Sequence, residues 1–207
     1  DEILASVEPA GLKGLAFMEN GMRNVTNIRG PIEKPEDFKG LKIRTMENPM
    51  HMAAFSVMGA DPTPMAFGEL FTALQQRTID AQENPLTVIY SSKFYEVQQY
   101  LTITHHLYSP TALLMSLDFY ESLPEDLKQV VNEAAVEAAI YERQCCDEQE
   151  ARLLDQLVSE GMIVNEPDMA PFVEATASLY ETFVGEAAGL VKPDILARVR
   201  EIIASQK

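Results

Sequence analysis

The most constraining feature of the sequence is a helix-favouring segment of unusual length, Pro124–Gly161. Ala, Glu, Leu and Gln dominate it, and its first and last residues are proline and glycine, which are favoured at helix starts and ends respectively. One helix of about 35 residues would extend about 50 Å. That is long for a helix of a single globular domain. The segment therefore predicts a bent helix, a helix that connects two lobes, or a helix that supports oligomerisation.

A second feature is Arg44, which lies near the end of a short apolar strand predicted at Leu41–Thr45. A cation in such a strand is hard to bury without a partner, and a guanidinium matches a carboxylate with two parallel N–H donors. The polar segment Gln82–Asn84 is predicted to return beside this strand, which indicates an anion site. An ion pair with Glu47 or Glu69 is the alternative, and the residues alone favour neither.

The remaining pattern alternates extended and helical segments, as in an α/β protein. Asp61–Met65 contains two prolines and cannot be a central strand throughout. The extended segments are Leu12–Met18, then Arg23–Asn27 after a turn at Glu19–Gly21, Ile79–Asn84, Phe94–Ser109, Pro110–Leu117 and Met162–Asn165. The helical segments are Pro49–Met58, Phe67–Gln76, Leu86–Ser92, Asp168–Ala188 and Pro193–Ser205, with a helix tail at Asp1–Ala10.

Five segments carry a resemblance to a known family, in the family's order and spacing. They read NGMRNVTN (20–27), PEDFKGLKIRTMENP (35–49), GADPTPMAFGELFTALQQ (59–76), IDAQENP (79–85) and FYEVQQYLTITHHLYSP (94–110). The chain resembles the solute-binding proteins of TRAP (tripartite ATP-independent periplasmic) transporters, of the DctP type. It departs from them at Ala81, where the family usually has glycine in D-G-Q-E-N-P, which bears on local backbone freedom.

The resemblance implies an α/β, two-lobe periplasmic-binding-protein-like (type II) fold with a long bridging helix. The chain starts inside the family's pattern, so it looks like a C-terminal fragment that lacks about the first hundred residues and leaves the first lobe incomplete. On this basis 1–20 and 109–145 would be the remnant of lobe I, and 21–108 and 146–207 would form lobe II. The helix at about 124–160 would bridge the lobes.

The resemblance also implies a binding site and a function. Arg44 would hold a carboxylate, Arg23 would add a second charged contact, and Asn84 would donate or accept a further hydrogen bond, with Phe67 and Glu83 beside them. Taken alone, Arg23 reads as a strand-edge arginine and Phe67 as a core aromatic. The implied function is periplasmic capture of a small organic acid, a C4-dicarboxylate or a sugar acid such as a uronate, and its delivery to the membrane permease subunits. No catalysis and no cofactor are implied.

Composition and motifs exclude several other classes. A net charge of −16 argues against nucleic acid and anionic membrane surfaces as partners, and no apolar run approaches the roughly 18 residues of a membrane span. Adjacent Cys145 and Cys146 fit neither a disulfide nor a zinc motif. His105 and His106 would face opposite sides of a strand, so no metal site is predicted. No nucleophile elbow, P-loop or dinucleotide motif is present.

Two alternative functions remain from the sequence. One is an enzyme that acts on a carboxylate substrate with Glu83 as the base. The other is a fragment that acts only as a helix-mediated oligomer. An incomplete lobe would expose apolar surface, which a second copy or a swapped dimer could cover.

Overall fold

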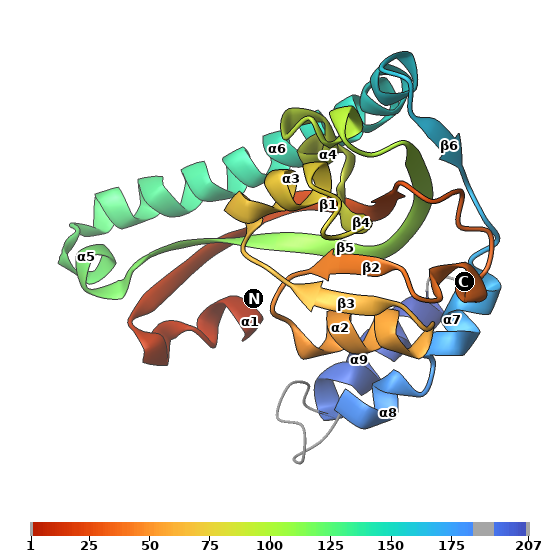
Figure 1. Ribbon diagram of the computed structural model, residues 1–207. Coiled ribbons are helices and arrows are strands. Elements are labelled where there is room, and N and C mark those ends of the chain that lie inside the picture. Colours follow the sequence, from red (N-terminus) through yellow and green to blue (C-terminus); the bar gives the residue numbers. More distant parts are fainter. Residues whose placement is uncertain (1, 184–192, 206–207) are drawn as a thin grey trace. The chain divides into compact units, whose positions relative to one another are not determined.

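The structure, a computed structural model, describes residues 2–183 and 193–205 (Figure 1). The chain divides into two compact units. Unit 1 contains Asp1–Asn24, Asn84–Tyr95 and His105–Met162, and unit 2 contains Val25–Glu83, Glu96–Thr104 and Ile163–Lys207. The bounds of these two units differ from those of the lobes expected from the sequence. The assignment of residues to lobe I and lobe II therefore stays a prediction.

Six strands follow the order β3-β2-β4-β1-β5-β6. Their bounds are β1 Leu12–Asn27, β2 Lys42–Thr45, β3 Asp61–Pro64, β4 Ala81–Pro85, β5 Tyr100–Ser116 and β6 Ile163–Asn165. Within unit 2, β2 pairs in parallel with β3 and with β4, and β5 pairs in parallel with β6. The proline-containing strand β3 stands at the end of the order, which confirms that it is not a central strand.

The helices of unit 2 are α2 Pro49–Val57, α3 Phe67–Gln75, α7 Ala170–Thr176, α8 Leu179–Phe183 and α9 Pro193–Ser205, with a 3-10 turn, η2, at Pro35–Phe38. Parallel strands need crossover connections, and α2 and α3 supply those between β2, β3 and β4. The Asn48 side chain caps α2 by accepting hydrogen bonds from two backbone N–H groups. Phe38 lies in the core, with its ring centroid 5.5 Å from that of Phe55 and 6.2 Å from that of Phe172.

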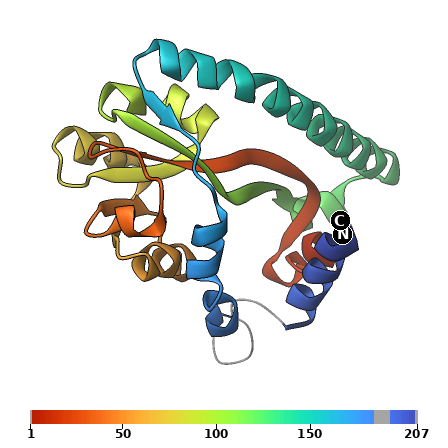
Figure 2. The same cartoon turned by 90° about the vertical axis from the view of Figure 1, so that its right-hand side faces the viewer.

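Unit 1 contains the long helix α6, Glu125–Ser159, which is 35 residues long and continuous (Figures 1 and 2). Its length and position confirm the helix predicted from Pro124 to Gly161. Ala135 and Ala139 on α6 pack against Ala16 of β1, where small side chains allow a close approach. The other helical elements of unit 1 are α1 Glu2–Ala5, η1 Glu8–Ala10, α4 Leu86–Ser91 and α5 Leu117–Ser122. The 3-10 helix η3, Phe94–Glu96, has its first two residues in unit 1 and its last residue in unit 2.

The structure differs from the prediction in three regions. The turn predicted at Glu19–Gly21 is wrong, because β1 runs through it and Gly21 takes φ +104° without ending the strand. The two extended runs predicted between Phe94 and Leu117 are one strand, β5. The helix predicted from Asp168 to Ala188 is divided into α7 and α8, and its residues 184–188 lie outside the described part of the chain.

Candidate functional site

Arg44 is the best-defined cation of the predicted site. It lies on β2, 4% exposed, in parallel register with Thr63 on one side and Gln82 on the other. Its Nε and Nη2 both donate to the carbonyl oxygen of Met65, at 2.9 and 2.7 Å. Two donors on one acceptor fix the plane of the guanidinium, so the side chain is oriented before any ligand arrives.

The Met65 carbonyl is a contact that the sequence analysis missed. Met65 follows Pro64 at the end of β3, and the prolines at 62 and 64 fix φ on this short segment. Every residue has a backbone carbonyl, so the sequence does not indicate which one accepts a hydrogen bond from a side chain. The proline-rich segment between a strand and a helix is the sequence signal that could have indicated a contact at Met65.

The structure brings Arg23 and Asn84 together. Both lie in unit 1, Arg23 on β1 and Asn84 on β4, and they are 2% and 4% exposed. Arg23 Nη2 donates to Asn84 Oδ1 at 3.0 Å. The two residues are 61 positions apart in the sequence, so this hydrogen bond could not be predicted from it. They meet because β1 and β4 are neighbours in the strand order. Arg23 is therefore not an exposed strand-edge arginine.

The other two predicted site residues have contrasting surroundings. Glu83 lies on β4 and is completely buried, whereas Phe67, the first residue of α3, is 49% exposed. A half-exposed phenyl ring is not a core aromatic, so the core alternative for Phe67 is wrong. A carboxyl group that is completely buried is stable only where nearby groups hydrogen-bond or pair with it.

A buried polar network crosses unit 2 beside Arg44. Gln82, the register neighbour of Arg44, donates from Nε2 to Thr26 Oγ1 at 2.8 Å. The Thr26 hydroxyl donates in turn to Gln98 Oε1 at 3.0 Å. All three side chains are buried, and buried networks of this kind hold their members in one geometry when every group is bonded. The network anchors the strand that carries Glu83.

A separate cluster of titratable groups lies in unit 1 where α6 meets β1. Burial raises the pKa of the Cys146 thiol to about 12, helped by its hydrogen bond to Glu142 Oε1 at 3.2 Å. Burial also raises the pKa of Glu19, together with repulsion from neighbouring carboxylates. A thiol with so high a pKa carries almost no thiolate at neutral pH, so we expect Cys146 to react slowly with electrophiles.

Metal ligands do not gather anywhere in the described residues. No group of three or more His, Cys, Asp or Glu side chains there could hold an ion. His105 Nε2 lies 3.4 Å from Glu150 Oε1, a contact between β5 and α6 at the surface of unit 1. In the same part of the chain, no helix is both long and apolar enough to cross a membrane.

Comparison with known proteins identifies relatives of high similarity. The chain is 41% identical over 197 residues to the 2,3-diketo-L-gulonate-binding periplasmic protein YiaO of Escherichia coli K12. The match covers 93% of this chain and 60% of YiaO. The chain thus spans about three-fifths of the length of that relative.

Solved structures show the same fold. A TRAP periplasmic solute-binding protein from Polaromonas sp. JS666, bound to D-erythronate, is 46% identical and superposes with a TM-score of 0.84, covering 88% of this chain and 60% of that one. A second, from Xanthobacter autotrophicus Py2 with bound β-D-galacturonate, is 33% identical with a TM-score of 0.90, covering 99% of this chain and 66% of that one. The predicted two-lobe periplasmic-binding-protein-like fold, present here in part, is confirmed.

The sequence also matches a family as a whole, over residues 1–186. That match contains every segment on which the predicted resemblance rests. The chain belongs to the DctP family, the bacterial extracellular solute-binding proteins of family 7.

Proposed function

We propose that this chain is part of the periplasmic solute-binding component of a TRAP transporter, and that it captures a small organic acid for delivery to membrane permease subunits. Membership of the DctP family supports this function. Two structural relatives carry the sugar acids D-erythronate and β-D-galacturonate, so a hydroxylated monocarboxylate is the ligand class that we propose. The protein binds and releases its ligand without chemical change.

The observation that carries the proposal is the burial and fixed orientation of Arg44. Burying a guanidinium costs free energy unless its charge is balanced and its donors are bonded. The Met65 carbonyl accepts from two of its N–H groups and fixes the plane of the guanidinium, a group whose geometry matches that of a carboxylate. In the proposed mechanism Arg44 binds the ligand carboxylate with parallel hydrogen bonds.

Arg23 and Asn84 supply further contacts to the ligand in this proposal. Their mutual hydrogen bond holds the Arg23 guanidinium and the Asn84 amide in one arrangement, which suits recognition of a carboxylate or a hydroxyl. Phe67 offers an exposed aromatic face, and Glu83 offers an acceptor for a sugar hydroxyl. Ligand capture would then shift the protein towards the form that the permease binds.

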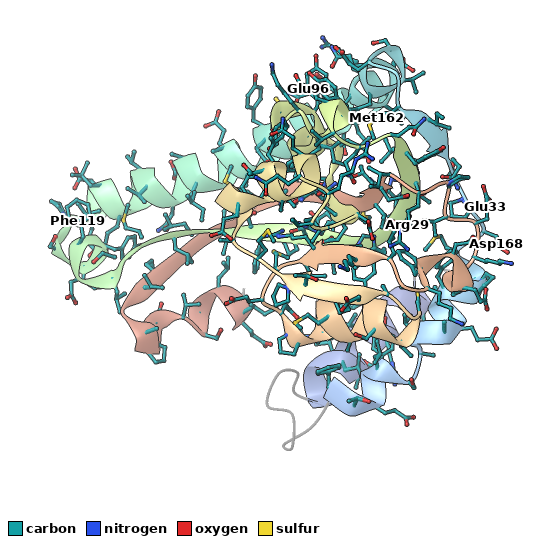
Figure 3. All side chains as sticks on the ribbon, in the orientation of Figure 1. Arg29, Glu33, Glu96, Phe119, Met162 and Asp168 are labelled. Carbon is teal, nitrogen blue, oxygen red and sulfur yellow. The ribbon has the colours of Figure 1, made fainter. Side chains whose placement is uncertain are left out.

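A thermal-shift titration tests the proposal. D-galacturonate, D-erythronate and succinate are added to the wild-type chain, to Arg44→Ala and to Arg29→Ala. Arg29, labelled in Figure 3, is an exposed arginine of the same unit, paired with Asp80, and controls for the loss of one positive charge. A ligand at 100 times its Kd stabilises by about 2.7 kcal/mol. The shift should fall sharply in Arg44→Ala and persist in Arg29→Ala; an equal shift in both variants, or none in the wild type, refutes the assignment.

A further inference from the structure

A shallow groove on unit 1 has no part in the site proposed above. It lies between α4 and α6, which pack against each other (Figure 1), and its volume is about 470 Å³. Small-ligand pockets commonly occupy about 300–1,000 Å³. Most of the side chains that line it are polar: Thr87, Tyr90, Ser91, Gln149, Arg152 and Gln156.

The spacing of these residues follows from helix geometry. Gln149, Arg152 and Gln156 are three and four residues apart, so they fall on one face of α6 and place a guanidinium between two amides. Thr87 and Ser91 are four residues apart on α4 and present their hydroxyls on one face of that helix. The groove therefore has one cation with neutral hydrogen-bonding groups on both walls.

The charge in this groove is unusual for the chain. Acidic residues outnumber basic ones by 32 to 16, yet none of the residues lining the groove is acidic. Glu148 stands four residues before Arg152, a spacing at which helical ion pairs form. Even so, the Arg152 side chain makes no ion pair or hydrogen bond with any residue that the structure describes. Its charge is available to an anion in the groove.

We propose that the groove between α4 and α6 is a second binding site, which takes a small hydroxycarboxylate. Arg152 binds the carboxylate, because a guanidinium offers it two parallel donors. Gln149, Gln156 and the hydroxyls of α4 bind the ligand's hydroxyl groups, and Tyr90 borders the groove with an aromatic ring. This site needs neither Arg44 nor the function proposed for it.

A nuclear magnetic resonance titration of the ¹⁵N-labelled chain tests this site residue by residue. D-galacturonate is the probe, and D-galactose, which has the hydroxyls but no carboxylate, is its control. D-galacturonate should cause saturable shifts of the amide signals of Ser91, Gln149 and Gln156. Arg152→Gln should weaken this binding about tenfold or more, while Arg77→Gln, which removes an exposed charge from unit 2, should not change it.

A second variant keeps the test decisive if Arg152→Gln fails to fold. Gln156→Glu retains a helix-favouring residue and adds a negative charge to the groove, so it should also weaken D-galacturonate binding. The proposal is wrong if the groove signals do not shift, if D-galacturonate binds Arg152→Gln or Gln156→Glu as tightly as it binds Arg77→Gln, or if D-galactose binds as well as the acid. Because the signals are assigned to single residues, binding here is distinguished from binding at Arg44.

Discussion

Thr26→Val is the substitution that best tests the buried network beside Arg44. Valine has the shape of threonine and keeps its β-branch, so the change leaves no cavity and suits a strand. It removes the acceptor for Gln82 Nε2 and the donor to Gln98 Oε1, two hydrogen bonds of 2.8 and 3.0 Å. Each lost partner leaves a buried polar atom less well satisfied, at about 1–3 kcal/mol apiece. Gln98 also donates from Nε2 to the carbonyls of Asp80 and Val97, which keeps part of its bonding.

We therefore expect Thr26→Val to lower the free energy of unfolding by about 2–4 kcal/mol, or Tm by about 5–15 °C. Urea and thermal denaturation, followed by circular dichroism, measure both quantities. Thr26→Ser retains the hydroxyl and should cost only about 1 kcal/mol for its lost methyl group. Thr63→Val, on the end strand β3, controls for the substitution itself and should be nearly neutral. The reasoning fails if Thr26→Val is no less stable than Thr26→Ser.

Three further predictions concern unit 1. Gly21→Ala should destabilise the protein by about 1–2 kcal/mol in urea denaturation, since Gly21 has φ +104° and a Cβ there would lie 3.2 Å from that of Pro85. Iodoacetamide should modify Cys146 at pH 8 at least about tenfold more slowly than it modifies glutathione, because a thiol pKa of about 12 leaves little thiolate; an equal rate would contradict the raised pKa. Glu19 has a raised pKa, so its ionised form destabilises the folded state above that pKa and the penalty disappears as the pH falls through it. Glu19→Gln should therefore stabilise the protein at pH 7 more than the exposed control Glu137→Gln does, and the difference should vanish in acid.

Local sequence signals determined most elements of this fold. The long helix α6 was predictable because helix formers run without interruption between a proline and a glycine. Strand β3 was predictable as a non-central strand because its prolines have no backbone N–H to donate, whereas a central strand bonds to a neighbour on each side. Gly21 was misleading, since glycine permits a turn but also permits a strand to continue with positive φ. At Gly21 the chain stays extended because β1 pairs with other strands, and the local sequence does not show that pairing.

The candidate site was predictable in its residues but not in its contacts. The family resemblance named Arg44, Arg23 and Asn84, and the structure shows how two of them are held: Arg23 by Asn84, and Arg44 by a backbone carbonyl. Neither contact has a sequence signature, because one joins residues 61 positions apart and the other uses the main chain. The groove around Arg152 was also missed, since an arginine on a long acidic helix reads as an ordinary surface charge.

The burial of Arg23 and Arg44 is hard to explain by stability alone. This chain carries a net charge of −16 and few cations, so exposed arginines would reduce repulsion at its surface at little cost. Moving a guanidinium into the interior sacrifices hydration, a cost that its partners in the folded chain must offset. Apolar residues of similar size would fill the same strand positions without that cost. A fixed, buried guanidinium is instead what the proposed anion site requires, because its geometry is set before a ligand's carboxylate arrives.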